Sequence, residues 1–272
     1  MLEDSHVGFV GGGNMGEALI RGLLAASLLT SDRLHVFDVV GSRMEYLANL
    51  YQVQAAPSIG DLTGACHLIV LAVKPQNMAA VLEELRLHLT HEVLVISIAA
   101  GVSLSTIAKG LPAGTPVVRV MPNTPAIVLQ AASALSRGSH VKDAHMEQAL
   151  ALFRAVGTAI EVEEKWMDTV TGLSGSGPAY VLLVIESLID AGVLMGLPRP
   201  VARELAVQTV LGTAKMVQET GNHPAELKDL ITSPGGTTIR GLHVLEERGI
   251  RGTLKQAVEA ATLRSRELGK AS

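Results

Sequence analysis

Residues 7–16, Val-Gly-Phe-Val-Gly-Gly-Gly-Asn-Met-Gly, decide the fold of the N-terminal half. The apolar run Val7–Val10 predicts a buried strand, and the pattern that follows predicts a helix over Asn14–Ala26. The glycines at 11, 13 and 16 fit G-x-G-x-x-G, in which the backbone turns tightly and approaches a pyrophosphate at a helix N-terminus. The stretch therefore predicts a dinucleotide-binding βαβ unit.

Short apolar runs alternate with helical patterns as far as residue 162, which is typical of parallel βαβ units. We expect an α/β fold with an N-terminal Rossmann-type, doubly wound sheet over residues 1–165. After Val7–Val10, the expected strands are Leu34–Asp38, His67–Ala72, Val93–Ile98, Val117–Val120, Ala132–Leu135 and Thr158–Val162. After Asn14–Ala26, the expected helices are Ser42–Tyr51, Gln76–Leu89, Ser103–Lys109 and Lys142–Ala155.

The C-terminal part, residues 166–272, is predicted to be an all-α domain for oligomerisation and substrate binding. From Trp166 to Leu268 the pattern is helical and shows no convincing strand. In the helix Pro178–Leu194 only Glu186 and Asp190 are charged, and both lie on one face. A helix that is apolar on most sides must be buried on most sides. We expect it to be buried between subunits or, alternatively, between the two domains of one chain.

The composition excludes several classes of protein. The net charge of −4 comes without a basic patch, which argues against nucleic acid as a partner. The most apolar stretches, Leu68–Val73, Val93–Val102 and Ala179–Ile185, fall short of the roughly 20 residues of a membrane span, so we expect no membrane partner. A single cysteine, Cys66, and an acidic start at Met1–His6 that is unlike a signal peptide predict a cytoplasmic protein. The histidines show no metal-binding spacing, and no metal site is expected.

Asp38, at the end of the second strand, is the acidic residue that the dinucleotide pattern requires. A carboxylate there accepts hydrogen bonds from an unmodified ribose and repels a 2′-phosphate, which favours NADH over NADPH. Arg43 is close enough in sequence to weaken that preference, or it is a solvated helix residue.

Three further segments end strands at the edge where such folds bind ligands. In Ala72-Val73-Lys74-Pro75 the proline ends the strand, and Lys74 is placed to reach a phosphate or ribose. Ser97–Gly101 has small residues that let a nicotinamide ring lie close. In Met121–Pro125 two prolines stiffen a loop around Asn123, which is suited either to the carboxamide or substrate, or to a structural Asx turn.

Two motifs in the helical half are candidates for substrate binding. Thr171–Tyr180 is rich in glycine and runs into the apolar helix, so its backbone can approach a ligand closely. In Ile231–Thr238, backbone N–H groups and the hydroxyls of Ser233, Thr237 and Thr238 form a neutral nest at a helix N-terminus, suited to a carboxylate. Either motif alone is also compatible with an ordinary helix cap.

Over essentially its whole length the chain resembles the pyrroline-5-carboxylate reductase family. The segments that carry the resemblance are Gly-Gly-Gly-Asn-Met at 11–15, Ala-Val-Lys-Pro at 72–75, Met-Pro-Asn-Thr-Pro at 121–125, Ser-Gly-Ser-Gly-Pro-Ala-Tyr at 174–180 and Ser-Pro-Gly-Gly-Thr-Thr at 233–238. The last two are the most specific.

The resemblance implies hydride transfer from NAD(P)H to 1-pyrroline-5-carboxylate, which yields L-proline. It also implies a helical domain that forms homodimers, with the substrate pocket at the dimer interface and with dimers assembling into decamers. By the same resemblance, Ser233, Gly236 and Thr237 hold the substrate carboxylate, Thr238 bonds the ring nitrogen, and Glu164 lies near the substrate. The implied cofactor contacts, taken together with those from the strand ends, are Val10, Gly11, Gly12, Gly13, Asn14, Met15, Asp38, Ser58, Ala72, Val73, Lys74, Pro75, Ala100 and Asn123. Many members have a small polar residue where Asp38 stands, and Leu230 replaces a polar residue found in some relatives.

Two other functions compete with this interpretation. A β-hydroxyacid dehydrogenase needs a lysine for the hydroxyl proton at the position of Val181, which disfavours it. A protonated imine brings its own proton, so no dedicated acid is required. The second alternative is a non-catalytic regulator that binds a dinucleotide.

Overall fold

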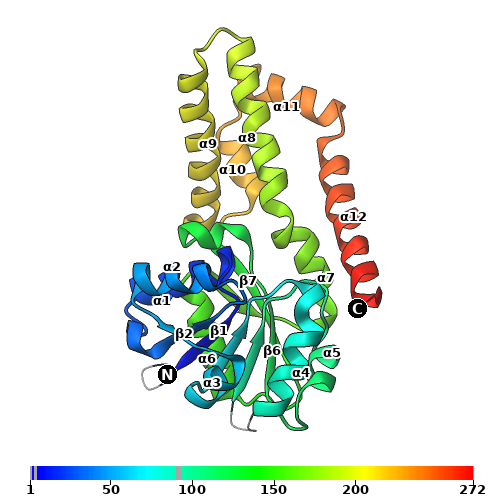
Figure 1. The fold of residues 1–272 in the computed structure, drawn as a ribbon. Helices are drawn as coiled ribbons and strands as arrows, with labels where there is room; N and C mark the ends of the chain where they lie inside the picture. The colour runs from blue at the N-terminus through cyan, green and yellow to red at the C-terminus, as the bar shows by residue number, and fades with distance from the viewer. Residues whose placement is uncertain (1, 3–4, 90–92, 272) are drawn as a thin grey trace. The chain divides into compact units, whose positions relative to one another are not determined.

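The computed structural model describes residue 2, residues 5–89 and residues 93–271. Of the acidic N-terminal residues, Met1, Glu3 and Asp4 lie outside the described residues. The chain divides into two compact units, one made of residues 1–176 and 259–272 and the other of Gly177–Val258 (Figure 1).

The strands of the first unit form one sheet in the order β3-β2-β1-β4-β5-β6-β7-β8. Between β1 and β4 the chain order of the strands reverses, and such a switch point is where open α/β sheets bind ligands. The strands are β1 (Val7–Val10), β2 (Leu34–Phe37), β3 (Gln54–Ala55), β4 (Leu68–Leu71), β5 (Leu94–Ser97), β6 (Val117–Met121), β7 (Ala131–Arg137) and β8 (Gly157–Glu161). The predicted Rossmann-type sheet is thus confirmed.

Strands β7 and β8 are the exceptions to the parallel arrangement, because β7 pairs with β6 in the antiparallel direction and β8 runs parallel to β7. Only residues 122–130 connect β6 and β7, and they include a 3-10 turn at Thr124–Val128. A parallel crossover needs a dozen or more residues, so this connection permits only an antiparallel return. The expectation of parallel units throughout was wrong at this point.

Helices cover both faces of the sheet (Figure 1). Phe9, Leu19 and Phe153 belong to the core under α1, α2 and α6, whereas Leu62 and Ile69 belong to the core under α3, α4 and α5. Burial on both faces explains why the central strands are continuous apolar runs. The helices are α1 (Asn14–Ala25), α2 (Gly41–Tyr51), α3 (Ile59–Ala65), α4 (Met78–His88), α5 (Leu104–Gly110) and α6 (Asp143–Arg154).

Strand β3 and helix α3 were not predicted. Both are short, and Pro57, Gly60 and Gly64 interrupt the periodic pattern around them. A signal was nevertheless present, because Ser58 and Asp61 have capping-box spacing. In the structure the Ser58 hydroxyl accepts a hydrogen bond from Asp61 N at 3.1 Å and caps α3.

The second unit contains only helices among its elements, as predicted. They are α8 (Gly177–Leu194), α9 (Arg199–Thr220), α10 (Pro224–Leu230), α11 (Thr237–Glu247) and the first part of α12 (Ile250–Ala271). Helices α8 and α9 lie side by side (Figure 1). No residue of α8 is buried, and Leu182 and Leu183 are 64% and 63% exposed. The apolar surface of α8 is therefore left without cover inside the helical unit.

The chain that leads into α8 contains a 3-10 turn (Glu164–Trp166), helix α7 (Met167–Val170) and a π-helical turn (Thr171–Gly175). With α8 they form a helical stretch, Glu164–Leu194, that is long and apolar enough to span a membrane. The expectation that every apolar stretch is too short was wrong here, since it counted only uninterrupted apolar residues. Length and composition do not separate a membrane span from a helix buried between subunits.

Candidate active site

A crevice of about 390 Å³ lies at the carboxyl ends of the central strands of the Rossmann unit. It is placed at the switch point, where the segments after β1, β4, β5 and β6 come together. Its lining residues are Gly13, Asn14, Met15, Ala72, Val73, Lys74, Ile98, Met121, Pro122, Asn123, Thr124 and Gly175. Seven of the predicted cofactor residues are in this set: Gly13, Asn14, Met15, Ala72, Val73, Lys74 and Asn123.

The N-terminus of α1 has the properties of a pyrophosphate site. Gly13 is its N-cap, and no side chain caps the helix. The N–H groups of the first turn therefore remain open to a ligand. A Cβ on Gly13 would meet no atom within 4 Å, so the space beside this N-cap is open. Gly11 has φ +103°, and a Cβ there would stand 2.6 Å from the Ala72 carbonyl oxygen, so only glycine fits the turn.

Asp38 lies just beyond β2 with both carboxylate oxygens hydrogen-bonded to the backbone. Gly12 N donates to Oδ2 at 2.7 Å, and Val40 N donates to Oδ1 at 2.9 Å. These bonds fix the carboxylate beside the glycine turn, as a ribose partner requires.

The other predicted cofactor residues lie outside the lining of the crevice. Val10 is buried in β1 and Gly11 and Gly12 are buried in the turn, while Ser58 caps α3. Pro75 begins a 3-10 turn, and Ala100 is exposed after β5. The crevice is also lined by residues that were not predicted as cofactor contacts, although most of them follow strand ends. They are Ile98, Met121, Pro122, Thr124 and Gly175.

The side chain of Asn123 is used to hold the structure together. Its Nδ2 donates to the Ser174 carbonyl oxygen at 3.0 Å, and its Oδ1 accepts from Ala132 N at 2.9 Å. The amide thus ties the loop after β6 to the π-helical turn and to β7. These contacts are structural, but they do not form the predicted Asx turn, since the partners lie 51 and 9 positions away. The role of Asn123 at the carboxamide or substrate stays a prediction.

Glu164 lies in a different hollow of the same unit, of about 470 Å³. Its Oε1 accepts hydrogen bonds from Leu104 N at 2.6 Å and from Arg119 Nη1 at 3.3 Å. Glu164 therefore supports the first turn of α5 and neutralises the buried Arg119 guanidinium.

In the helical unit, the predicted substrate residues cluster at the start of α11. Gly236 is the N-cap with no side-chain cap bond, and its N–H donates to the Ser233 carbonyl oxygen at 3.1 Å. Gly235 has φ +70°, which makes the tight turn possible. The first N–H groups of α11 are left open, with the Ser233, Thr237 and Thr238 hydroxyls nearby in sequence. Thr238 is half-buried, whereas Ser233 and Thr237 are exposed.

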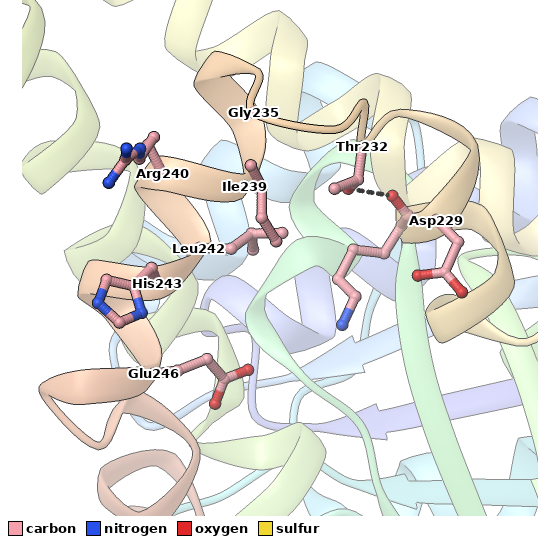
Figure 2. A pocket seen from close by; sticks show the side chains of 9 residues that line it. Asp229, Thr232, Gly235, Ile239, Arg240, Leu242, His243 and Glu246 are labelled. Carbon is pink, nitrogen blue, oxygen red and sulfur yellow. Dashed lines mark hydrogen bonds between the residues drawn. The ribbon is translucent and has the colours of Figure 1, made fainter.

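A cavity of about 580 Å³ lies between α10 and α11 (Figure 2). The Thr232 hydroxyl donates to the Lys228 carbonyl oxygen at 2.7 Å and closes the end of α10 beside it. The cavity is lined by Lys228, Asp229, Thr232, Gly235, Ile239, Arg240, Leu242, His243 and Glu246. The four predicted substrate residues of the loop are not part of this lining.

Comparison with known proteins gives a family match in each of the two units. Residues 164–268 match the family model of pyrroline-5-carboxylate reductase dimerisation, and residues 6–101 match that of coenzyme F420-dependent NADP oxidoreductases. The chain is 48% identical over 269 residues to the pyrroline-5-carboxylate reductase of Methanosarcina acetivorans, covering 99% of this chain and 100% of the relative. The chain belongs to the pyrroline-5-carboxylate reductase family. It is also 48% identical to the reductase of Synechocystis, covering 97% and 98% of the two chains.

Solved structures of the family have the same fold. The pyrroline-5-carboxylate reductase of Coxiella burnetii superposes with a TM-score of 0.92 at 36% identity, covering 97% of this chain and 98% of that one. The Plasmodium falciparum enzyme, solved with NADP bound, gives a TM-score of 0.88 at 34% identity, covering 98% of each chain. The predicted resemblance and fold class are thus confirmed.

The dimerisation match explains the uncovered helix of the helical unit. Helix α8 lies inside the matched region, and its exposed leucines form an apolar surface of the kind that marks an interface between proteins. Oligomerisation through the helical half is confirmed by this match. Residues 6–101 of the Rossmann unit match an NADP oxidoreductase domain, and a solved structure of the family contains NADP, so the cofactor is NAD(P)H.

Proposed function

We propose that this protein reduces 1-pyrroline-5-carboxylate to L-proline with NAD(P)H, the final step of proline biosynthesis. The observation that carries the proposal is a pair of uncapped helix N-termini in one chain. That of α1 lies at a dinucleotide crevice, and that of α11 lies in a neutral, hydroxyl-rich loop. Family membership at 48% identity over the whole chain supports the same reaction.

The loop before α11 holds the substrate in this proposal. The Ser233 hydroxyl and the backbone N–H of Thr237 bind the carboxylate at the turn that Gly236 makes, and the positive end of the α11 dipole stabilises its charge. The N–H of Gly236 itself donates to the Ser233 carbonyl oxygen and holds this turn. Thr238 receives a hydrogen bond from the protonated ring nitrogen and so fixes which face of the ring is presented. Glu164 remains our proposed acidic neighbour of the substrate.

The Rossmann unit holds the cofactor. The segment Val10–Met15 binds the pyrophosphate, Asp38 binds the adenosine ribose, and Lys74 offers a cation at the rim of the crevice. We keep Ser58, Ala72, Val73, Pro75, Ala100 and Asn123 as further proposed contacts. The reduced nicotinamide supplies the hydride for the substrate. Because the Asp38 carboxylate repels a 2′-phosphate, we propose a preference for NADH.

The substrate chemistry fits the absence of a proton-transferring residue at Val181, which is 47% exposed on α8. A protonated imine is already electrophilic, so hydride adds to its carbon while the π electrons remain on nitrogen as the lone pair of the secondary amine. No proton needs to be exchanged in that step. Positioning of two reactants then supplies the catalysis, whereas an alcohol would need a base at this place.

We further propose that homodimers assemble into decamers and that the enzyme is cytoplasmic. The single cysteine in the chain, buried Cys66, is compatible with a reducing compartment. We also propose a functional boundary near residue 165, supported by the dimerisation match that starts at residue 164. Sedimentation velocity distinguishes a dimer from a decamer.

The proposed reaction is tested by following nicotinamide absorbance with 1-pyrroline-5-carboxylate and by measuring L-proline with an amino-acid analyser. NADH and NADPH are compared side by side, and a panel of β-hydroxy acids with NAD⁺ serves as the control. We expect equimolar proline and oxidised cofactor. Cofactor binding without proline, or turnover of a hydroxy acid instead, would overturn the proposal.

A further inference from the structure

Arg43 lies next to the adenosine side of the proposed cofactor site. It is in the first turn of α2, and its Nε donates to the Gly12 carbonyl oxygen at 2.5 Å. The N–H of the same Gly12 donates to the Asp38 carboxylate. A carboxylate and a guanidinium thus bind the N–H and the carbonyl oxygen of one residue, Gly12, beside the proposed ribose contact. A free arginine at this place would bind a 2′-phosphate with a bidentate fork.

Arg43 is not free, because Glu17 binds it. The Arg43 Nη2 forms an ion pair with Glu17 Oε2, and Glu17 lies in the first turn of α1. The two side chains retain only 26% and 23% of their exposure, so the pair is partly shielded from solvent. The guanidinium also stacks over the Tyr46 ring at 4.9 Å from the centroid.

Glu17 is itself held from the other side. The Tyr51 hydroxyl donates to Glu17 Oε1 at 2.9 Å, and the Tyr46 hydroxyl lies 3.5 Å from the same oxygen. Burial raises the pKa of Glu17, but the hydrogen bonds from Arg43 and Tyr51 outweigh it, so the pKa lies below its ordinary value. Glu17 is therefore ionised at neutral pH and keeps its charge for Arg43.

We propose that Glu17 is a specificity-determining residue that withholds Arg43 from a cofactor 2′-phosphate. Asp38 repels the phosphate, and Glu17 occupies the nearby cation that would otherwise attract it. Two residues then discriminate against NADPH: Asp38, which lies just beyond β2, and Glu17, which lies in the first turn of α1. The inference rests on the proposed use of a nicotinamide dinucleotide, and it goes beyond Asp38 alone.

The test uses two probes that lack the nicotinamide, adenosine 2′,5′-bisphosphate and 5′-AMP. Their dissociation constants are measured by isothermal titration calorimetry on the full-length protein and on Glu17→Gln, Arg43→Ala and the double variant. We expect Glu17→Gln to bind the bisphosphate about fivefold more tightly, which is the upper limit of the effect measured for partly exposed charge pairs. The dissociation constant of 5′-AMP should be unchanged. The double variant should lose that gain, since the arginine that provides it is gone.

A merely structural link between α1 and α2 predicts a different result. In that case Glu17→Gln would lower the melting temperature and leave the ratio of the two dissociation constants unchanged, and this result would overturn the inference. A gain that persists in the double variant would also overturn it. If Glu17→Gln does not fold, Tyr51→Phe loosens Glu17 without changing any charge and should shift the ratio in the same direction, by less; an unchanged ratio there is equally contrary.

The outcome is separable from that of the proposed reaction. Neither probe carries a hydride, so the affinity shift is measured whether or not the protein forms proline. A shift without proline formation would keep the inference and reject the reaction, whereas proline formation without a shift would do the reverse.

Discussion

Replacing Gly236 with alanine should remove the Ser233 hydroxyl from the proposed carboxylate site while leaving the helical unit folded. A Cβ on Gly236 would overlap the Ser233 Oγ and stand 3.2 Å from the Ser233 carbonyl oxygen. The φ of −72° at Gly236 is one that alanine adopts without strain. The clash is therefore relieved by rotation of the serine side chain, which turns its hydroxyl away from the nest.

The expected magnitude follows from the bond that is lost. A hydrogen bond to a charged group contributes about 1.5–3 kcal/mol, so kcat/KM for 1-pyrroline-5-carboxylate should fall about 10- to 100-fold. The free energy of unfolding should change by only about 1 kcal/mol, because alanine is a poorer N-cap than glycine. The dissociation constant of NADH should be unchanged, since the dinucleotide crevice belongs to the Rossmann unit.

Steady-state kinetics on three variants test this reasoning. Ser233→Ala is the matched control, because it removes the hydroxyl directly. In the double variant nothing remains to be displaced, so the added methyl group should cost little more than Ser233→Ala alone. The reasoning is refuted if Gly236→Ala keeps wild-type kcat/KM, or if its loss adds in full to that of Ser233→Ala.

Three further substitutions have defined outcomes. Thr238→Ala should raise KM and lower kcat, with kcat/KM about five- to tenfold lower and NADH binding unchanged, as one hydrogen bond implies; wild-type kinetics would remove Thr238 from the mechanism. Asp38→Ser should raise the ratio of kcat/KM for NADPH to that for NADH about tenfold, and a constant ratio would refute the ribose contact. Burial and the neighbouring His6, whose Nδ1 lies 3.0 Å from His35 Nε2, hold the pKa of His35 below its ordinary value against the opposing effect of Asp32. Below about pH 6.5 the unfolded state then binds more protons, so stability is full above that pH and falls as pH decreases. His35→Asn should flatten this dependence in urea unfolding between pH 5 and 7, and an unchanged slope would speak against the histidine pair.

The sequence predicted best those features that depend on local patterns. The run Val7–Val10 was placed to the residue, because a strand buried on both faces is continuously apolar. Gly13 of the glycine turn and the segment Ala72–Lys74 both line the observed crevice, since strand ends meet at one edge of the sheet. The apolar surface of Pro178–Leu194 likewise indicated an interface from composition alone.

What the sequence did not reveal depends on contacts between distant residues. Glu17 and Arg43 lie 26 positions apart, and Glu164 and Leu104 lie 60 apart, so no periodicity connects either pair. The bonds of Asn123 to Ser174 and Ala132 were not predicted for the same reason, since these partners lie 51 and 9 positions away. The direction of β7 was also missed, because it depends on the length of a loop rather than on the strand pattern.

The central claim is direct hydride transfer to the ring of a carboxylated cyclic imine. The most direct test uses NADH in which deuterium replaces both hydrogens at C4 of the dihydronicotinamide. It is added with 1-pyrroline-5-carboxylate, and the product is examined by mass spectrometry and NMR. The product should be L-proline with one deuterium on C5, the carbon of the former C=N bond. Unlabelled proline, or oxidation of the cofactor without proline, would contradict it.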